Sequence, residues 1–213
     1  MYFKYFKLIT FFLLTCCNNL SVSKLPYFIT PDFTPFWINN YSKIDSLHRI
    51  KDFSFVNQNN EIIDKEYIKE KIVVSNFFFT TCPSICPNMT SNLKIIEEKF
   101  SKSEEVIILS HSVTPWIDSV KRLKNYQKLH NINSKNWHLI TGDKNKIYDL
   151  ARKSYFAEEE LGLNKNNNEF LHTEMVFLLD KNSHIRGIYN GTIKLEIKRL
   201  LEDIHILKNE SQI

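Results

Sequence analysis

Glycine is scarce in this sequence, with four residues among 213. Its scarcity argues against collagen-like repeats and against nucleotide-binding designs built on glycine-rich loops. No run of basic residues interleaved with aromatic residues occurs, and the net charge of +4 is spread over the chain, so we expect no nucleic-acid partner. Internal repeats are also absent. Because hydrophobic residues make up 43% of the chain, the sequence predicts one folded domain with a proper core.

The N-terminal apolar run is too short to span a bilayer as a helix. This run, residues 8–14, follows two lysines and precedes two cysteines, which is typical of a bacterial secretory signal. The sequence LLTC resembles a lipoprotein signal in which Cys16 becomes the lipidated first residue, and Cys17 is the other candidate. A plain signal peptide or a short N-terminal anchor is the alternative. We therefore expect a signal peptide at residues 1–17, of the lipoprotein type by this resemblance. The domain would then be anchored to a membrane of the bacterial envelope and face the periplasm or extracytoplasmic space.

The next segment, residues 18–47, is rich in Pro, Asn, Ser and Thr. It predicts a tether and an extended lead-in segment that lies on the domain, with its aromatic side chains packed against the fold. The domain itself is expected at residues 48–213. It begins with DFSFVNQNNEII, which predicts two short strands joined by an Asn-rich turn.

The rest of the chain alternates strand and helix patterns. Residues 71–80 form a nearly continuous run of β-branched and aromatic residues, as in a central strand buried on both faces. Apolar residues then recur at helical spacing from Met89 to Phe100. After this helix the sequence predicts, in chain order, a strand at 106–112, a helix at 115–130, a strand at 137–141, a helix at 144–154 and a surface loop at 157–170. Two hairpin strands at 173–180 and 184–190 and a helix at 193–207 follow. This order predicts an α/β, thioredoxin-like fold, with a central mixed sheet flanked by helices and an N-terminal strand or hairpin extension.

Cysteine is scarce as well, and beyond the N-terminus only Cys82 and Cys86 occur, in TTCPSICP. Two thiols four positions apart at a helix start lie close enough to form a disulfide or to bind one metal ion. The helix N-terminus favours thiolates and lowers their pKa. A structural bridge is disfavoured because closing so short a loop adds little stability. Ordinary dithiol oxidoreductases have two intervening residues, so the third one here disfavours routine thioredoxin activity.

Four segments together resemble the SCO/SenC copper proteins: NFFFTTCPSICPNMT, VIILSHSVTP, WHLITGD and FLHTEMVFLLD. These proteins are thioredoxin-like domains with a CxxxCP motif at the end of a central strand, and the resemblance covers about residues 52–207. It implies that copper, as Cu(I) or Cu(II), binds Cys82, Cys86 and His172, and that the two cysteines form a redox-active pair able to form a disulfide. It also implies a role in assembling the binuclear copper centre of a respiratory cytochrome oxidase. The implied partners are the oxidase's copper-accepting subunit and a thiol reductant or another copper chaperone.

The choice among seven histidines falls on His172, at the start of a predicted strand after the long loop. Redox thioredoxins carry a cis-proline in that region, and here no proline follows Pro115. His111 is a candidate only for the surroundings of the metal, and we expect a hydrogen-bonded histidine at a strand end. Two departures from the family pattern stand out: Leu171 replaces a frequent acidic residue, and of an Asp-Pro-x-x-Asp stretch only Pro115 and Asp118 remain.

Alternative functions stay open at this stage. The first is copper delivery, and the second is a thiol-disulfide reductase that keeps the acceptor's cysteines reduced. A peroxide-reducing enzyme is disfavoured, because peroxiredoxins have a threonine three residues before the reactive cysteine and this chain has Phe79 and Pro83 at those places. Zinc would also accept two thiolates and an imidazole, so the ligand types alone do not fix the metal.

Overall fold

The computed structural model describes residues 24–38, 44, 46–157 and 170–210. The predicted signal peptide with Cys16 and Cys17, and most of the predicted surface loop, lie outside these residues. Of the helices within these ranges, none combines the length and the apolar character needed to cross a membrane.

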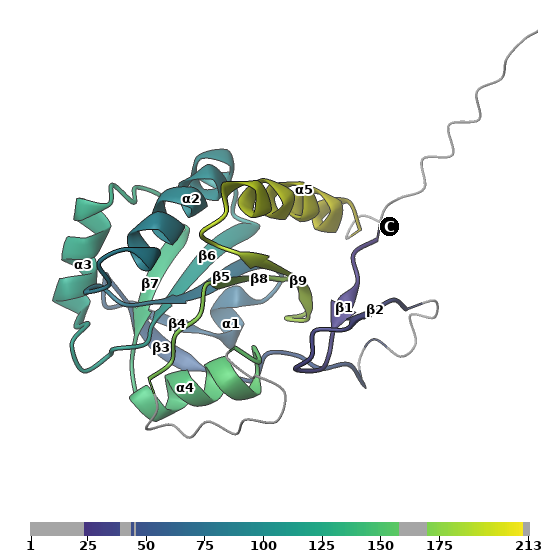
Figure 1. The fold of residues 1–213 in the computed structure, drawn as a ribbon, viewed down its shortest axis with the longest axis horizontal. Coiled ribbons are helices and arrows are strands. Elements are labelled where there is room, and N and C mark those ends of the chain that lie inside the picture. The colour runs from purple at the N-terminus through teal and green to yellow at the C-terminus, as the bar shows by residue number, and fades with distance from the viewer. Residues whose placement is uncertain (1–23, 39–43, 45, 158–169, 211–213) are drawn as a thin grey trace, which may run out of the picture.

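Within the described residues, nine strands form one mixed sheet in the order β2-β1-β9-β8-β5-β6-β7-β3-β4 (Figure 1). The central strands β5, β6 and β7 are parallel, and every other described pair is antiparallel. The strands are β1 (Tyr27–Phe28), β2 (Pro35–Phe36), β3 (Ser54–Asn57), β4 (Ile62–Asp64), β5 (Ile72–Phe78), β6 (Val106–Ser112), β7 (Trp137–Thr141), β8 (Met175–Leu179) and β9 (Ile185–Asn190).

Helices cover both faces of the sheet. In Figure 1, α2 and α5 lie side by side on one face and α4 lies on the other. The helices are α1 (Lys65–Ile68), α2 (Ile85–Phe100), α3 (Val120–Leu129), α4 (Lys144–Lys153) and α5 (Lys194–Glu210). The alternation of side chains along β5 serves both cores, because Val74 and Phe78 join the cluster under α2 and α5 while Val73 and Phe77 join the cluster on the α4 side. All seven residues of β5 are buried, which confirms the predicted central strand.

The helix predicted at residues 115–130 begins later in the structure, at Val120. Residues 115–119 form a turn instead, in which the carbonyl of Thr114 accepts the N–H of Asp118 over 2.9 Å. The side chain of Asp118 is completely buried and hydrogen-bonded, so it holds the chain in this turn. The start of the predicted helix was therefore wrong because a tertiary contact overrides the helical pattern.

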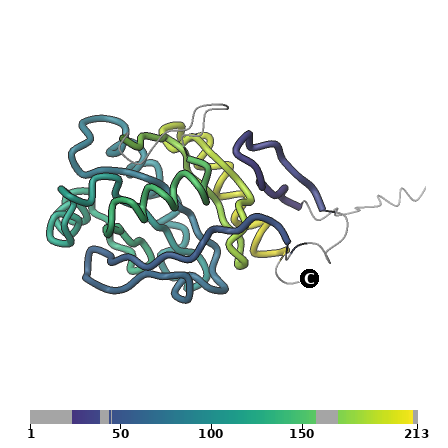
Figure 2. The backbone as a smooth tube through the Cα atoms, turned by 90° about the horizontal axis from the view of Figure 1, so that it is seen from below, coloured from purple at the N-terminus to yellow at the C-terminus, as the bar shows by residue number. Residues whose placement is uncertain are grey.

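The lead-in segment contributes β1 and β2, a hairpin that extends the sheet next to β9. Figure 2 shows this hairpin at one edge of the molecule, beside the C-terminal segment. Tyr27 is buried, and the guanidinium of Arg186 lies 4.0 Å from its ring centroid. The prediction that the aromatic side chains here pack against the fold is wrong for Phe36 and Trp37, whose exposed fractions are 45% and 58%.

Candidate functional site

Cys82 and Cys86 lie where β5 leads into α2, and both are buried free thiols. The backbone N–H of Cys86 donates to the sulfur of Cys82 over 3.3 Å. Ser84 occupies the N-cap position of α2 but makes no side-chain cap hydrogen bond. The first N–H groups of a helix lack partners within it, so here the Cys82 sulfur acts as an acceptor in place of a capping side chain.

The two thiols have opposite pKa shifts. Burial raises the pKa of Cys82, but the N–H groups of Cys86, Ser84 and Ile85 donate to its sulfur and bring the pKa below the ordinary value. Burial is also the largest cause at Cys86, where it raises the pKa to about 12 with a further contribution from neighbouring Cys82. Cys82 is therefore the more readily ionised thiol of the two, and burial favours the protonated form of Cys86.

His172 lies in the segment before β8, and its side chain is exposed. Its ring centroid is 6.5 Å from that of Phe79, which precedes Cys82 by three residues, and Phe79 also packs against Phe170. The structure thus places His172 beside the residues that lead into the cysteine loop. In the part of the chain that the structure describes, no three His, Cys, Asp or Glu side chains converge as metal ligands would. The two neighbouring thiols are soft donors of the kind that copper prefers, and His172 would have to approach them to complete a three-ligand site.

A buried carboxylate, Asp118, lies close to the cysteine loop. It accepts the backbone N–H of Thr80 over 3.1 Å and the hydroxyls of Ser112 and Thr114 over 2.6 and 3.0 Å. The Thr80 hydroxyl also donates to it, and the Arg122 Nε lies 3.7 Å away. The sequence pattern marked Asp118 only as the remnant of a family stretch, and this network was not predicted.

The comparisons with known proteins agree with the fold and the motif. The family model described as SCO1/SenC matches residues 42–208. The chain belongs to the SCO1/SenC family. A relative described as a SCO1 protein homolog, from Bacillus subtilis, is 26% identical over 159 residues, which cover 74% of this chain and 81% of the relative.

Solved structures of SCO1/SenC proteins have the same thioredoxin-like fold. A SCO1/SenC family lipoprotein from Bacillus anthracis has a TM-score of 0.65 and 24% identity, covering 76% of this chain and 95% of the other. BsSco, described as a member of the Sco family of cytochrome c oxidase assembly proteins with a disulfide switch, has a TM-score of 0.63 and 26% identity, covering 74% and 92%. Arabidopsis thaliana ScoI with copper bound has a TM-score of 0.57 and 20% identity, covering 76% and 98%. The predicted fold class is therefore confirmed.

His111 differs from its prediction in this SCO1/SenC chain. It is completely buried in β6, and neither ring nitrogen has a hydrogen-bond partner within the described residues, so the predicted hydrogen-bonded histidine was wrong. The rings around it belong to the core on the α4 side of the sheet, away from the cysteines: Phe53, Phe55, Phe77 and Tyr155. Burial lowers the pKa of His111 to about 3.

Because of this burial, His111 should make the protein labile to acid. Folding lowers its pKa, so its contribution to stability is fully present above the ordinary value of 6.5 and is lost as the pH falls toward 3. Between pH 6.5 and 4.5 we expect a loss of about 2 to 3 kcal/mol in the free energy of unfolding from this group. Urea unfolding at the two pH values measures the loss. In His111→Leu the loss of stability between the two pH values should be smaller by about 2 to 3 kcal/mol. In His205→Leu, at an exposed position of α5, the loss should equal that of the wild type. A wild-type loss in His111→Leu would show that His111 is not its source.

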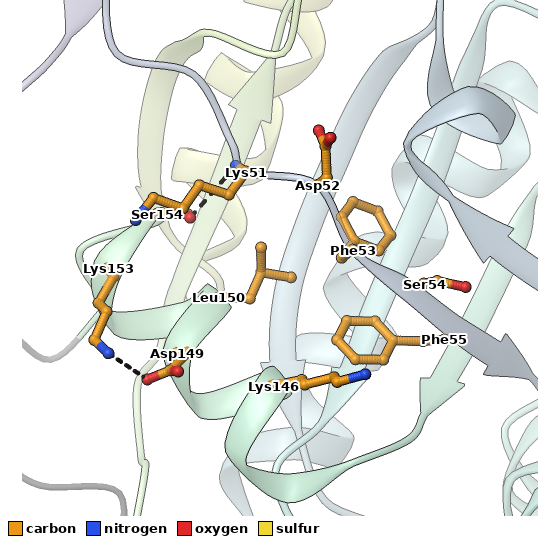
Figure 3. A pocket seen from close by; sticks show the side chains of 10 residues that line it. All are labelled: Lys51, Asp52, Phe53, Ser54, Phe55, Lys146, Asp149, Leu150, Lys153 and Ser154. Carbon is orange, nitrogen blue, oxygen red and sulfur yellow. Dashed lines mark hydrogen bonds and ion pairs between the residues drawn. The ribbon is translucent and has the colours of Figure 1, made fainter.

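A surface hollow of about 560 Å³ lies between α4 and the segment that enters β3 (Figure 3). Its lining is apolar at Phe53, Phe55 and Leu150 and basic at three lysines, Lys51, Lys146 and Lys153. Lys153 is paired with Asp149, Nζ to Oδ1, over 2.7 Å. None of the three candidate copper ligands lines this hollow, so it is separate from the candidate site.

Proposed function

We propose that this SCO1/SenC protein binds copper through Cys82, Cys86 and His172 and delivers it to the copper-accepting subunit of a respiratory cytochrome oxidase, assisting assembly of the binuclear copper centre. The observation that carries the proposal is the adjacent pair of thiols at a helix N-terminus, with His172 beside the same loop. The description of BsSco as an oxidase assembly protein and the copper-bound ScoI structure support it.

The chemistry of the pair suits a copper cargo. The N–H groups that donate to the Cys82 sulfur lower its pKa and so favour the thiolate, and thiolates are the soft donors that Cu(I) prefers. Cys86 must release its proton when the metal binds, so binding weakens as the pH falls. An imidazole from His172 as third ligand suits Cu(I) or Cu(II).

We further propose an envelope protein held to a bacterial membrane, with a lipoprotein-type signal at residues 1–17, a lipid on Cys16 or Cys17, a tether at 18–47 and the domain at 48–213. The description of the Bacillus anthracis relative as a lipoprotein supports this. In this arrangement a thiol reductant or a second copper chaperone serves the dithiol on the periplasmic or extracytoplasmic side.

The position of the described lead-in suits such a tether. The backbone N–H of Leu25 donates to Glu210 over 2.8 Å, at the C-terminal end of α5. The other end of α5 follows Thr192, whose carbonyl accepts the side-chain amide of Asn88, six residues after Cys82. A helix of 17 residues spans about 25 Å, so the chain enters the domain far from the cysteines. An anchor on that side leaves the dithiol facing away from the membrane.

Anaerobic copper titration of the reduced full-length protein tests the copper site. We expect the wild type to bind about one copper per chain, and absorption and EPR spectra monitor the binding. Cys82→Ser and Cys86→Ser should abolish this binding, and His172→Ala should weaken it at least about tenfold, the effect of losing one metal ligand or its close support. His205→Ala serves as the matched histidine control. Wild-type affinity in His172→Ala would remove His172 from the site.

A thiol-disulfide reductase is the second candidate, favoured by the contrast between a nucleophilic Cys82 and a protonated, buried Cys86. It would reduce a disulfide of the acceptor, and its own cysteines would become the disulfide. This function needs both cysteines but tolerates His172→Ala. An oxidase assembly assay with the Cys86→Ser and His172→Ala variants separates the two functions, because copper delivery fails in both variants and thiol reduction fails only in the first.

A further inference from the structure

We propose that Asp118 is the positioning residue of the cysteine loop and acts through Thr80 to keep Cys82 and Cys86 in reach of each other. The thiol-disulfide part of this inference stands on the structure alone, and its copper part rests on the proposed function.

Two segments that are distant in the sequence meet at the Asp118 carboxylate. The cysteine loop contributes the backbone N–H and the hydroxyl of Thr80, two residues before Cys82. The end of β6 and the turn after it contribute the hydroxyls of Ser112 and Thr114. The carboxylate itself comes from the turn before α3. A completely buried carboxylate is stable only where such donors surround it, so the cysteine loop and the connection from β6 to α3 are fixed relative to each other.

The second contact of Thr80 strengthens this connection. The Arg122 Nε donates to the Thr80 hydroxyl over 2.7 Å while lying 3.7 Å from Asp118. The hydroxyl therefore accepts from α3 and donates to the carboxylate at once, so its orientation is fixed. Charge-assisted hydrogen bonds of this kind are stronger than those between neutral groups.

Asp118 is not needed to cap α3. The side chain of Ser119 is the N-cap and accepts the N–H of Arg122 over 3.3 Å. The Asp118 carboxylate accepts instead from Thr80 of the cysteine loop and from Ser112 and Thr114. Its contacts therefore hold the cysteine loop and the turn before α3, and they do not cap the helix.

The test measures the equilibrium of the Cys82–Cys86 pair with glutathione. The two thiols give two electrons and two protons to one glutathione disulfide, which leaves as two glutathione thiols, and the protein sulfurs form the new bond. Thr80→Val removes the hydroxyl at nearly constant volume, Thr80→Ser retains it, and Asp118→Asn removes the charge. Asp143→Asn is the matched control, because it removes a carboxylate from an exposed N-cap where asparagine caps equally well.

We expect Thr80→Val and Asp118→Asn to lower the equilibrium constant for disulfide formation by about tenfold or more, the effect of losing a hydrogen bond to a charged group. Copper affinity in the titration above should fall by a similar factor, while Thr80→Ser and Asp143→Asn stay within about threefold of the wild type. A wild-type equilibrium constant in folded Thr80→Val would overturn the positioning role, even if Asp118→Asn fails to fold. A wild type that binds no copper, with the thiol equilibrium still shifted in Thr80→Val, would leave this role standing and overturn the proposed function.

Discussion

Iodoacetamide should alkylate Cys82 at least about a hundredfold faster than Cys86 in the reduced protein at pH 7.5. The thiolate is the reactive form, and the pKa of Cys82 is lowered while that of Cys86 is raised to about 12. At pH 7.5 a pKa of 12 leaves roughly three thiols in 100,000 ionised. Cys86 is also less exposed than Cys82, at 3% against 8%, which slows the reagent further.

Mass spectrometry of the single variants over pH 5 to 10 measures these rates separately. Cys86→Ser should stay fast, because the backbone N–H at position 86 still donates to the Cys82 sulfur. Its rate should rise with pH to a plateau whose midpoint lies below that of an ordinary thiol, since a lowered pKa makes the thiolate form earlier. Cys82→Ser should remain slow up to about pH 9. Equal rates in the two variants would show that the helix N-terminus does not give the two thiols different pKa values.

Much of the fold could be predicted from the sequence because the central strand has an unambiguous pattern. All seven residues of β5 are buried and five of them are apolar, so the nearly continuous run at residues 71–80 indicated a strand between two cores. The short helix α1 and the late start of α3 could not be predicted this way. Both depend on hydrogen bonds made by side chains. The Asp64 side chain accepts the N–H of Tyr67 at the start of α1, and the Asp118 network precedes α3.

The candidate site was only partly predictable for the same physical reason. Cys82 and Cys86 are four residues apart, so local spacing alone brought them together. Ser112 and Thr114 donate to Asp118 from the same stretch of chain, but Thr80 donates from 38 residues earlier, and no local pattern reveals a contact over that separation. The available signal was the cluster of short hydroxyl side chains at Ser112 and Thr114, just ahead of an acid, which are groups able to satisfy a buried carboxylate.

Leu171 occupies the position where the family often has an acidic residue, and the structure explains why this chain cannot simply accept one. Its side chain is completely buried in the cluster on the α4 side of the sheet, while its neighbours Phe170 and His172 are exposed. Its backbone N–H also lies within 3.5 Å of the Tyr148 hydroxyl. Burial of Leu171 thus fixes this segment so that His172 points outward beside Phe79.

Leu171→Asp should therefore lower the free energy of unfolding by about 3 to 5 kcal/mol, because it exchanges a packed side chain for a buried charge. Phe170→Asp, one residue earlier and 46% exposed, should cost less than about 1 kcal/mol. Urea unfolding of both variants at pH 7 measures the difference, and equal losses would contradict the anchoring role. In Leu171→Asp the copper affinity should fall as well, since the segment that presents His172 loses its anchor. In this SCO1/SenC chain Leu171, at the position where relatives often have an acidic residue, therefore anchors the segment that carries His172 to the core.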